Sequence, residues 1–143
     1  MSTTENKTTV LRLMDEYFNN GNEQTWDELA DPDVVIHGVT ADIRGAGAAK
    51  PFYAQLRKAF DPWHLAVEEL IAEGDQVVVR LIESGTMSGP VMGQPPNGKQ
   101  FVLETVQICR IHQGKLVEMW GFRDSGAIMR QLELVPGPAA IHT

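Results

Sequence analysis

Turn signals divide the second half of the chain, and they constrain the fold more than any other feature of the sequence. They are the dipeptides Gly74-Asp75, Asn97-Gly98 and Gln113-Gly114. The segments that they separate are rich in Val, Ile and Leu and cover residues 65–73, 76–87, 100–112 and 115–123. Glycine beside Asp or Asn is typical of connections between antiparallel strands. The pattern therefore predicts long antiparallel strands joined by hairpins.

The N-terminal part of the chain favours helices. Ser2 and Glu5 have the spacing of a capping box. An apolar stripe with helical periodicity follows them at Val10, Leu13, Met14, Tyr17 and Phe18. Gly21 is a suitable stop for this helix, and Asn22 can cap a short second one. Further helices are predicted over residues 47–60 and 125–134, and short strands over residues 34–37 and 42–44.

Helices that precede a run of hairpin-connected strands indicate an α+β fold, with a curved antiparallel sheet packed on three to four helices. The chain has the length of one domain, which we place at residues 1–135, followed by a loose C-terminal tail at residues 136–143. A strongly curved sheet folded over helices leaves a cone-shaped apolar cavity. Such cavities are the usual place for a small-molecule site.

Charge and composition exclude several classes of partner. The formal net charge is -7 and no run of Lys or Arg occurs, so we expect no nucleic acid partner. No apolar stretch is long enough for a membrane span or a signal peptide, which predicts a cytoplasmic protein without a membrane partner. The single cysteine, Cys109, fits a reducing compartment. The four histidines have no ligand-like spacing, so we expect no metal site.

Three segments resemble a known family. They read VVVRLIESGTMSGPVMGQPPNGKQF, ICRIHQGKLVEMW and DSGAIMRQL. Through them the chain resembles the SnoaL-like polyketide cyclase family, part of the NTF2-like superfamily that also contains the ketosteroid isomerases. The resemblance extends over nearly the whole chain. It implies a cone-shaped NTF2-like fold, a homodimer or a higher oligomer, and no cofactor.

The resemblance also places the functional residues of these families on this chain. In characterised cyclases an aspartate on the last strand is the acid/base of an aldol ring closure, and that position is Gly121 here. The histidines that accompany it correspond to Gln107 and Met119, so the known cyclase machinery is largely missing. In the ketosteroid isomerases the general base corresponds to His37, the oxyanion-binding acid to Gln107 and the oxyanion tyrosine to Met14.

Three residues are candidate catalytic groups, and each has a structural alternative. His37 can act as a general base at the cavity, because an imidazole titrates near neutrality, or it can be a partly exposed residue at a strand end. Gln107, in an apolar strand, can hold a developing oxyanion or make a structural hydrogen bond. Asp124, directly before Ser-Gly, can enter the pocket as a carboxylate or cap the last helix; the cap is the commoner use.

Strand alternation groups the residues around the pocket. One face of the long strand carries Thr105, Gln107 and Cys109. One face of the last strand carries Val117, Met119, Gly121 and Arg123, and the other carries Leu116, Glu118, Trp120, Phe122 and Asp124. Methionines adapt to apolar ligands, and tyrosines add a polar end. The residues that we expect to bind a ligand are Met14, Tyr17, Tyr53, Met87, Thr105 and Met119.

These observations predict a cofactor-independent acid/base enzyme of SnoaL-like type that cyclises or isomerises a small, largely apolar carbonyl compound. His37 would move a proton, and Gln107 would hold the oxyanion. A non-catalytic module that binds a hydrophobic ligand is an alternative, because the cyclase aspartate is absent. An epoxide-hydrolase relative is a third, although two aspartates cannot be placed on the pocket strands. The expected partner is a small apolar or carbonyl-containing molecule.

Overall fold

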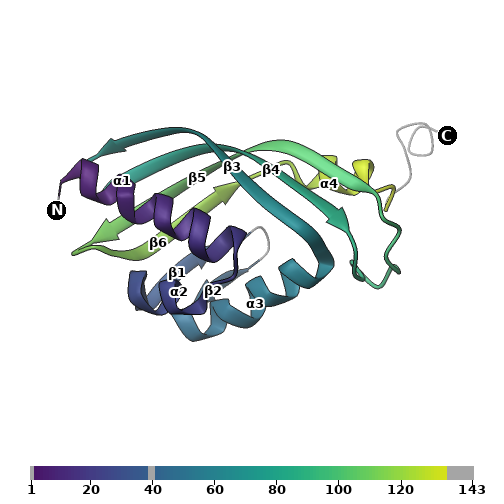
Figure 1. Cartoon of the computed structure of the whole chain (residues 1–143), viewed down its shortest axis with the longest axis horizontal. Coiled ribbons are helices and arrows are strands. Elements are labelled where there is room, and N and C mark those ends of the chain that lie inside the picture. Colours follow the sequence, from purple (N-terminus) through teal and green to yellow (C-terminus); the bar gives the residue numbers. More distant parts are fainter. Residues whose placement is uncertain (1, 39–40, 135–143) are drawn as a thin grey trace.

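The helices come mostly before the long strands, as the sequence predicts (Figure 1). The structure is a computed structural model that describes residues 2–38 and 41–134. Its helices are α1 (Thr3–Arg12), the π-helix η1 (Leu13–Asn19), α2 (Glu23–Leu29), α3 (Ala46–Ala59) and α4 (Ser125–Gln131). Its strands are β1 (Ala30–His37), β2 (Asp42–Arg44), β3 (Phe60–Glu73), β4 (Gln76–Met87), β5 (Gln100–His112) and β6 (Lys115–Phe122). The predicted tail, residues 136–143, lies outside the described residues.

The predicted helix starts are confirmed by side-chain hydrogen bonds. Ser2 Oγ accepts from the amide of Glu5 at 3.0 Å, and Glu5 Oε1 accepts from the amide of Ser2 at 3.1 Å, which completes the capping box of α1. Asn22 Oδ1 accepts from the amides of the second and third residues of α2. Gly21 ends the preceding helical segment with φ +70°, a conformation that favours glycine.

The sequence pattern does not predict that the first helix widens into the π-helix η1. At the end of η1, the side-chain amide of Asn19 makes two hydrogen bonds to the edge of the sheet. Asn19 Nδ2 donates to the carbonyl of Leu65 at 3.0 Å, and its Oδ1 accepts from the amide of Leu65 at 2.7 Å. Because Leu65 lies in the edge strand β3, this pair fixes the helical layer against the sheet.

The predicted hairpins are present. Gly74-Asp75 joins β3 to β4, and Gln113-Gly114 joins β5 to β6. The latter pair has positive φ at both residues, +50° and +77°, which the right-handed twist of the flanking strands favours. The Asn97-Gly98 signal instead closes a longer loop, residues 88–99, between the antiparallel strands β4 and β5.

Within the described residues the strands form one six-stranded sheet in the order β2-β1-β6-β5-β4-β3. The sheet is mixed: β1 pairs parallel to β6, and the other neighbours are antiparallel. The predicted curved sheet is therefore confirmed, with the difference that the pair β1–β6 is parallel. The chain between β1 and β6 passes through α3 and three long strands, so no hairpin dictates the relative direction of these two strands.

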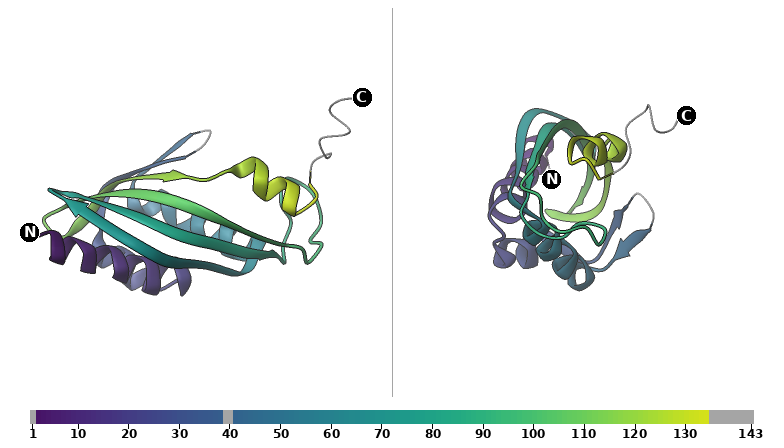
Figure 2. Two further views of the ribbon diagram at one scale, coloured as in Figure 1. Left: turned by 90° about the horizontal axis from the view of Figure 1, so that it is seen from above. Right: turned by 90° about the vertical axis from the view of Figure 1, so that its right-hand side faces the viewer.

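The sheet curls around the helices, as the NTF2-like fold requires, without closing (Figure 2). α1, η1, α2 and α3 cover its inner face, while α4 lies at the far end beside β5 (Figure 1). The core between the layers is aromatic at its centre, where the rings of Tyr17 and Trp26 stack with centroids 4.6 Å apart. None of the described helices is long and apolar enough to cross a membrane.

Candidate functional site

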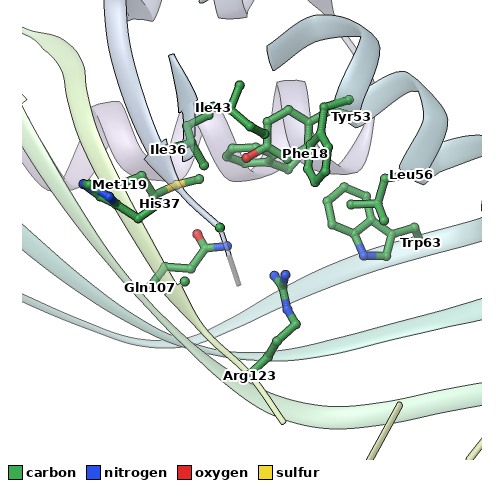
Figure 3. Close-up of a pocket in the computed structure, with 13 residues that line it drawn as sticks. Phe18, Ile36, His37, Ile43, Tyr53, Leu56, Trp63, Gln107, Met119 and Arg123 are labelled. Atoms are coloured by element: carbon green, nitrogen blue, oxygen red, sulfur yellow. The ribbon is translucent and has the colours of Figure 1, made fainter. Parts of the chain in front are cut away.

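A cavity lies between the inner face of the sheet and the helical segments η1 and α3 (Figure 3). Its apolar walls include Phe18, Ile36, Ile43, Phe52, Leu56 and Met119. The lining residues whose side chains carry polar atoms are His37, Tyr53, Trp63, Gln107 and Arg123. The cavity volume is about 60 Å³, which is room for a few water molecules. A larger ligand must therefore displace lining side chains or extend through the open side.

The cation of this cavity is Arg123, which follows the end of β6 and is held by a buried carboxylate. Arg123 Nε donates to Glu83 Oε1 at 2.9 Å, and the Arg123 side chain is 26% exposed. Glu83, in the middle of β4, is only 2% exposed. Trp63 Nε1 donates to its Oε2 at 2.9 Å, and Thr105 Oγ1 donates to its Oε1 at 3.1 Å. Three donors therefore stabilise the buried charge of Glu83.

The amide of Gln107 is the second polar group of the cavity. Gln107 is 4% exposed, and its Oε1 is buried without a hydrogen-bond partner in the described part of the chain. Its neighbour across the β5–β6 ladder is Gly121, where an added Cβ would meet nothing within 4 Å. The cavity therefore has free space beside Gln107, at the position where the cyclases carry their aspartate. The NH2 group of the same amide also makes no hydrogen bond within the described residues, so Gln107 is a candidate to bind a ligand through either its acceptor or its donors.

Tyr53 adds a hydroxyl to the same cavity. Burial raises the pKa of this phenol well above its usual range, so the group stays protonated at any physiological pH. It can donate a hydrogen bond but cannot act as a phenolate base. Burial likewise raises the pKa of Cys109 to about 12, which makes this thiol a packing residue and not a nucleophile.

His37 borders the cavity, but its ring is engaged elsewhere. Nε2 lies 2.6 Å from Glu118 Oε2, and Nδ1 lies 3.1 Å from Asp42 Oδ1. The ring also stacks on Trp120, with centroids 4.9 Å apart. Glu118 and Trp120 alternate along β6 with Met119 and Gly121, which line the cavity, so they lie on the outer face of the sheet. The structure therefore does not bring the imidazole together with the Gln107 amide.

The two carboxylates also favour the protonated form of His37, which lowers the share of neutral imidazole that could act as a general base. Hydrogen bonding to Glu118, and then to Asp42, raises the pKa of His37 above its usual 6.5. The imidazolium form is favoured in the folded protein. Its pairing stabilises the fold fully below the unfolded-state pKa, and this stabilisation is lost as the pH rises through the raised folded-state pKa.

We therefore expect the free energy of unfolding of the native protein to fall relative to that of His37→Gln as the pH rises from about 6 to 9. Urea unfolding of both proteins across this range measures the difference. The contributions of the other histidines cancel in this comparison. Parallel pH profiles for the two proteins would contradict the paired imidazolium.

Asp124 is the N-cap of α4, and its Oδ1 accepts from the amide of Ala127 at 2.9 Å. Of the two alternatives for Asp124, this geometry is that of the cap, which contributes about 1 kcal/mol to stability. Asp124 is not among the residues that line the cavity. Arg130 Nη2 lies 3.7 Å from its Oδ2, an exposed pair that adds little.

The predicted binding residues divide into two groups. Tyr53 and Met119 line the cavity, and Thr105 reaches it indirectly by donating to Glu83. Met14, Tyr17 and Met87 are buried in the core and are not among the lining residues. Helical periodicity shows that a side chain faces inward, but it cannot separate the packed core from the cavity within that core.

The face predicted for Leu116 from alternation along β6 is wrong. The sequence pattern places Leu116 on the outer face, but it is fully buried. The register with β5 shifts there, because Arg110 pairs with Glu118 and Ile111 pairs with Leu116, which leaves Val117 as an extra residue. This bulge returns Leu116 to the inner face together with Met119.

Sequence reasoning missed Arg123 and Glu83 as site residues. Alternation did place Arg123 on the same strand face as Gly121, which was the available signal. Glu83 carries no such signal, because its partner Arg123 is 40 residues away in the sequence. Arg80, also on β4, pairs with Glu69 at 3.2 Å and with Glu104 at 3.5 Å on the outer face.

Comparisons with known proteins agree with the fold. The SnoaL-like polyketide cyclase family matches residues 8–132. The chain belongs to this family. A candidate SnoaL-like polyketide cyclase from Jannaschia sp. CCS1 is 31% identical, with a TM-score of 0.86 over 94% of this chain and 95% of that chain.

Two other solved structures are similar. IdmH, a candidate polyketide cyclase from Streptomyces antibioticus, is 28% identical, with a TM-score of 0.79 over 90% of this chain and 98% of that chain. AclR, a candidate hydroxylase from Streptomyces galilaeus, shares the fold at 24% identity, with a TM-score of 0.82 over 94% of this chain and 100% of that chain. The comparison with curated proteins gives no significant match.

Proposed function

We propose that this SnoaL-like protein is a cofactor-independent enzyme that promotes enolisation of a small, largely apolar carbonyl compound. The observation that carries the proposal is the pairing of two polar groups in one apolar cavity: the amide of Gln107 and the guanidinium of Arg123 (Figure 3). Both offer N–H donors to an oxygen atom that becomes negatively charged. Glu83 fixes Arg123 beforehand, so no reorganisation is needed as the charge develops.

The reaction needs few groups from the protein. The C–H bond next to the substrate carbonyl breaks, its electron pair moves toward the carbonyl oxygen, and the proton passes to a water molecule at the open side of the cavity. The donors of Gln107 and Arg123 hold the resulting enolate oxygen in a site of low dielectric, where hydrogen bonds are strong. The enolate carbon then attacks a second carbonyl of the same molecule, whose π electron pair moves to its oxygen; this closes a ring, and the alkoxide takes back a proton from water. Alternatively, the enolate takes up the proton at another carbon, which isomerises the compound.

Solvent deuterium exchange tests this function without knowledge of the natural substrate. Cyclohexanone in D₂O near neutral pD should lose its α-proton signals in the proton NMR spectrum faster with the folded protein than with buffer or with the urea-unfolded chain. Gly121→Asp is the positive control, because it adds a carboxylate where the structure has free space. Exchange at the buffer rate with the native protein would rule out this acid/base chemistry.

A non-catalytic binding module is the second candidate, and a specific observation favours it. No Asp or Glu is among the residues that line the cavity in the described part of the chain, and the His37 ring is paired with Glu118 and Asp42. A ligand that binds and is recovered without deuterium would support this candidate. An epoxide-hydrolase relative is disfavoured by the same lining, which lacks the two aspartates. The homodimer and the cytoplasmic location stay predictions.

A further inference from the structure

Arg123 uses only one edge of its guanidinium within the protein. Its Nε donates to Glu83 Oε1, and neither Nη atom has a hydrogen-bond partner in the described part of the chain. The guanidinium end points into the cavity, into the space between Gln107 and Trp63 (Figure 3). Four N–H donors are therefore available at the far end of the group. An immobilised cation with a free donor edge indicates a ligand that brings its own acceptor oxygens.

The geometry of that free edge favours a planar anion. Two parallel N–H groups of an arginine match the two oxygens of a carboxylate, and such bidentate pairs are strong and directional. Glu83 does not bind this free edge. Its carboxylate accepts hydrogen bonds from Trp63, from Thr105 and from Nε on the opposite edge of Arg123. Arg123 carries one positive charge and already faces the negative charge of Glu83. A ligand with a single negative charge is therefore repelled less than a doubly charged phosphate.

We propose that the substrate is a small apolar oxo acid, that is, a carbonyl compound that also carries a carboxylate. Its carboxylate binds the free edge of Arg123, its carbonyl oxygen lies at Gln107, and its hydrocarbon part packs on walls such as Phe18, Ile36 and Leu56. This substrate class rests on the proposed function for the role of Gln107. In a simple ketone both donors of the cavity are available to the enolate oxygen, whereas in an oxo acid Arg123 holds the carboxylate and Gln107 alone holds the enolate oxygen. This division orients the substrate in one direction.

Ligand titration with benzoate and its neutral isostere benzamide tests the carboxylate subsite on the intact protein. Chemical shift changes of the Arg123 Nε–H and of the Gln107 side-chain amide report occupancy. We expect benzoate to bind at least ~10-fold more tightly than benzamide, because hydrogen bonds to a charged group are stronger than neutral ones. Intermolecular NOEs from the benzoate ring to the Met119 methyl group would place the ligand in the cavity, and this measurement needs no variant.

Two matched variants test whether Arg123 causes the preference for benzoate over benzamide. Arg123→Gln should abolish the difference between benzoate and benzamide, whereas Arg80→Gln makes the same charge change on the outer face of the sheet and should preserve it. Equal affinities for the two ligands in the native protein, or benzoate binding without NOEs to Met119, would overturn the proposal. These experiments distinguish a failure of the oxo acid proposal from a failure of the proposed function. Deuterium exchange of the ketone without a preference for benzoate refutes only the oxo acid substrate. Benzoate binding without ketone exchange refutes only the enolisation activity.

Discussion

Replacing Arg123 with methionine is expected to lower the free energy of unfolding by about 3 kcal/mol. The variant leaves the carboxylate of Glu83 in the core with two neutral donors, Trp63 and Thr105, and no cation. Removing one partner of a buried ion pair is costly because the remaining charge is deprived of both water and counter-charge. We expect the low end of the known range, because the Arg123 side chain is 26% exposed and water can replace part of its effect. Urea unfolding at neutral pH measures the loss.

Two further variants make this prediction specific. Arg123→Met combined with Glu83→Gln should recover much of the lost stability, because the neutral amide still accepts from Trp63 without a buried charge. Arg80→Met removes an exposed pair on the outer face and should cost less than about 1 kcal/mol. A loss in Arg123→Met that the second substitution fails to reduce would show that packing, and not the buried charge of Glu83, is responsible.

Replacing Gln107 with leucine is expected to slow the catalysed deuterium exchange by about 10² to 10³-fold while the protein stays folded. The substitution removes a donor from the position where the enolate oxygen forms, and it preserves the size of the side chain. Stability should be unchanged or higher, because Gln107 Oε1 has no partner in the described structure and its burial is unfavourable. The exchange rate of cyclohexanone and the midpoint of urea unfolding are measured on the same sample.

A slower deuterium exchange together with an unchanged or higher stability would indicate that the Gln107 amide serves function and not folding. If Gln107 instead made a structural hydrogen bond, its loss would lower stability by about 1 kcal/mol. Cys109→Ala is the matched control, because Cys109 lies on the same face of β5, is equally buried and is not among the cavity residues. This control should leave the exchange rate unchanged. A Gln107→Leu variant that exchanges cyclohexanone as fast as the native protein would remove Gln107 from the mechanism.

Local signals along the chain predicted the architecture well, because each depends on residues close in sequence. Ser2, Asn22 and Asp124 cap helices as their positions indicate, since a cap is a contact over two or three residues. The dipeptides at 74–75 and 113–114 turn the chain as a hairpin requires. The family resemblance is confirmed over residues 8–132.

The candidate site was only partly accessible from the sequence. Gln107 was found because a polar residue in an apolar strand is conspicuous, and its burial in the cavity agrees with that observation. Alternation places Arg123 on the cavity face but does not show its role, because that role depends on Glu83, which is 40 residues earlier in the chain. The resemblance gives His37 a catalytic role from its position in a related family, but such a position does not show which face of the sheet the ring occupies.

The α+β class, the helix caps and the tight hairpins follow from local periodicity and turn chemistry, and the family follows from the resemblance of three segments. Which polar groups meet is a property of the folded chain and not of any local segment. The fold turns the His37 ring toward Glu118 on the outer face, and it joins Glu83 to Arg123 on the inner one. The physical reason is that a buried charge must find its partner across the sheet, and the register and bulges that bring the two together involve every strand between them.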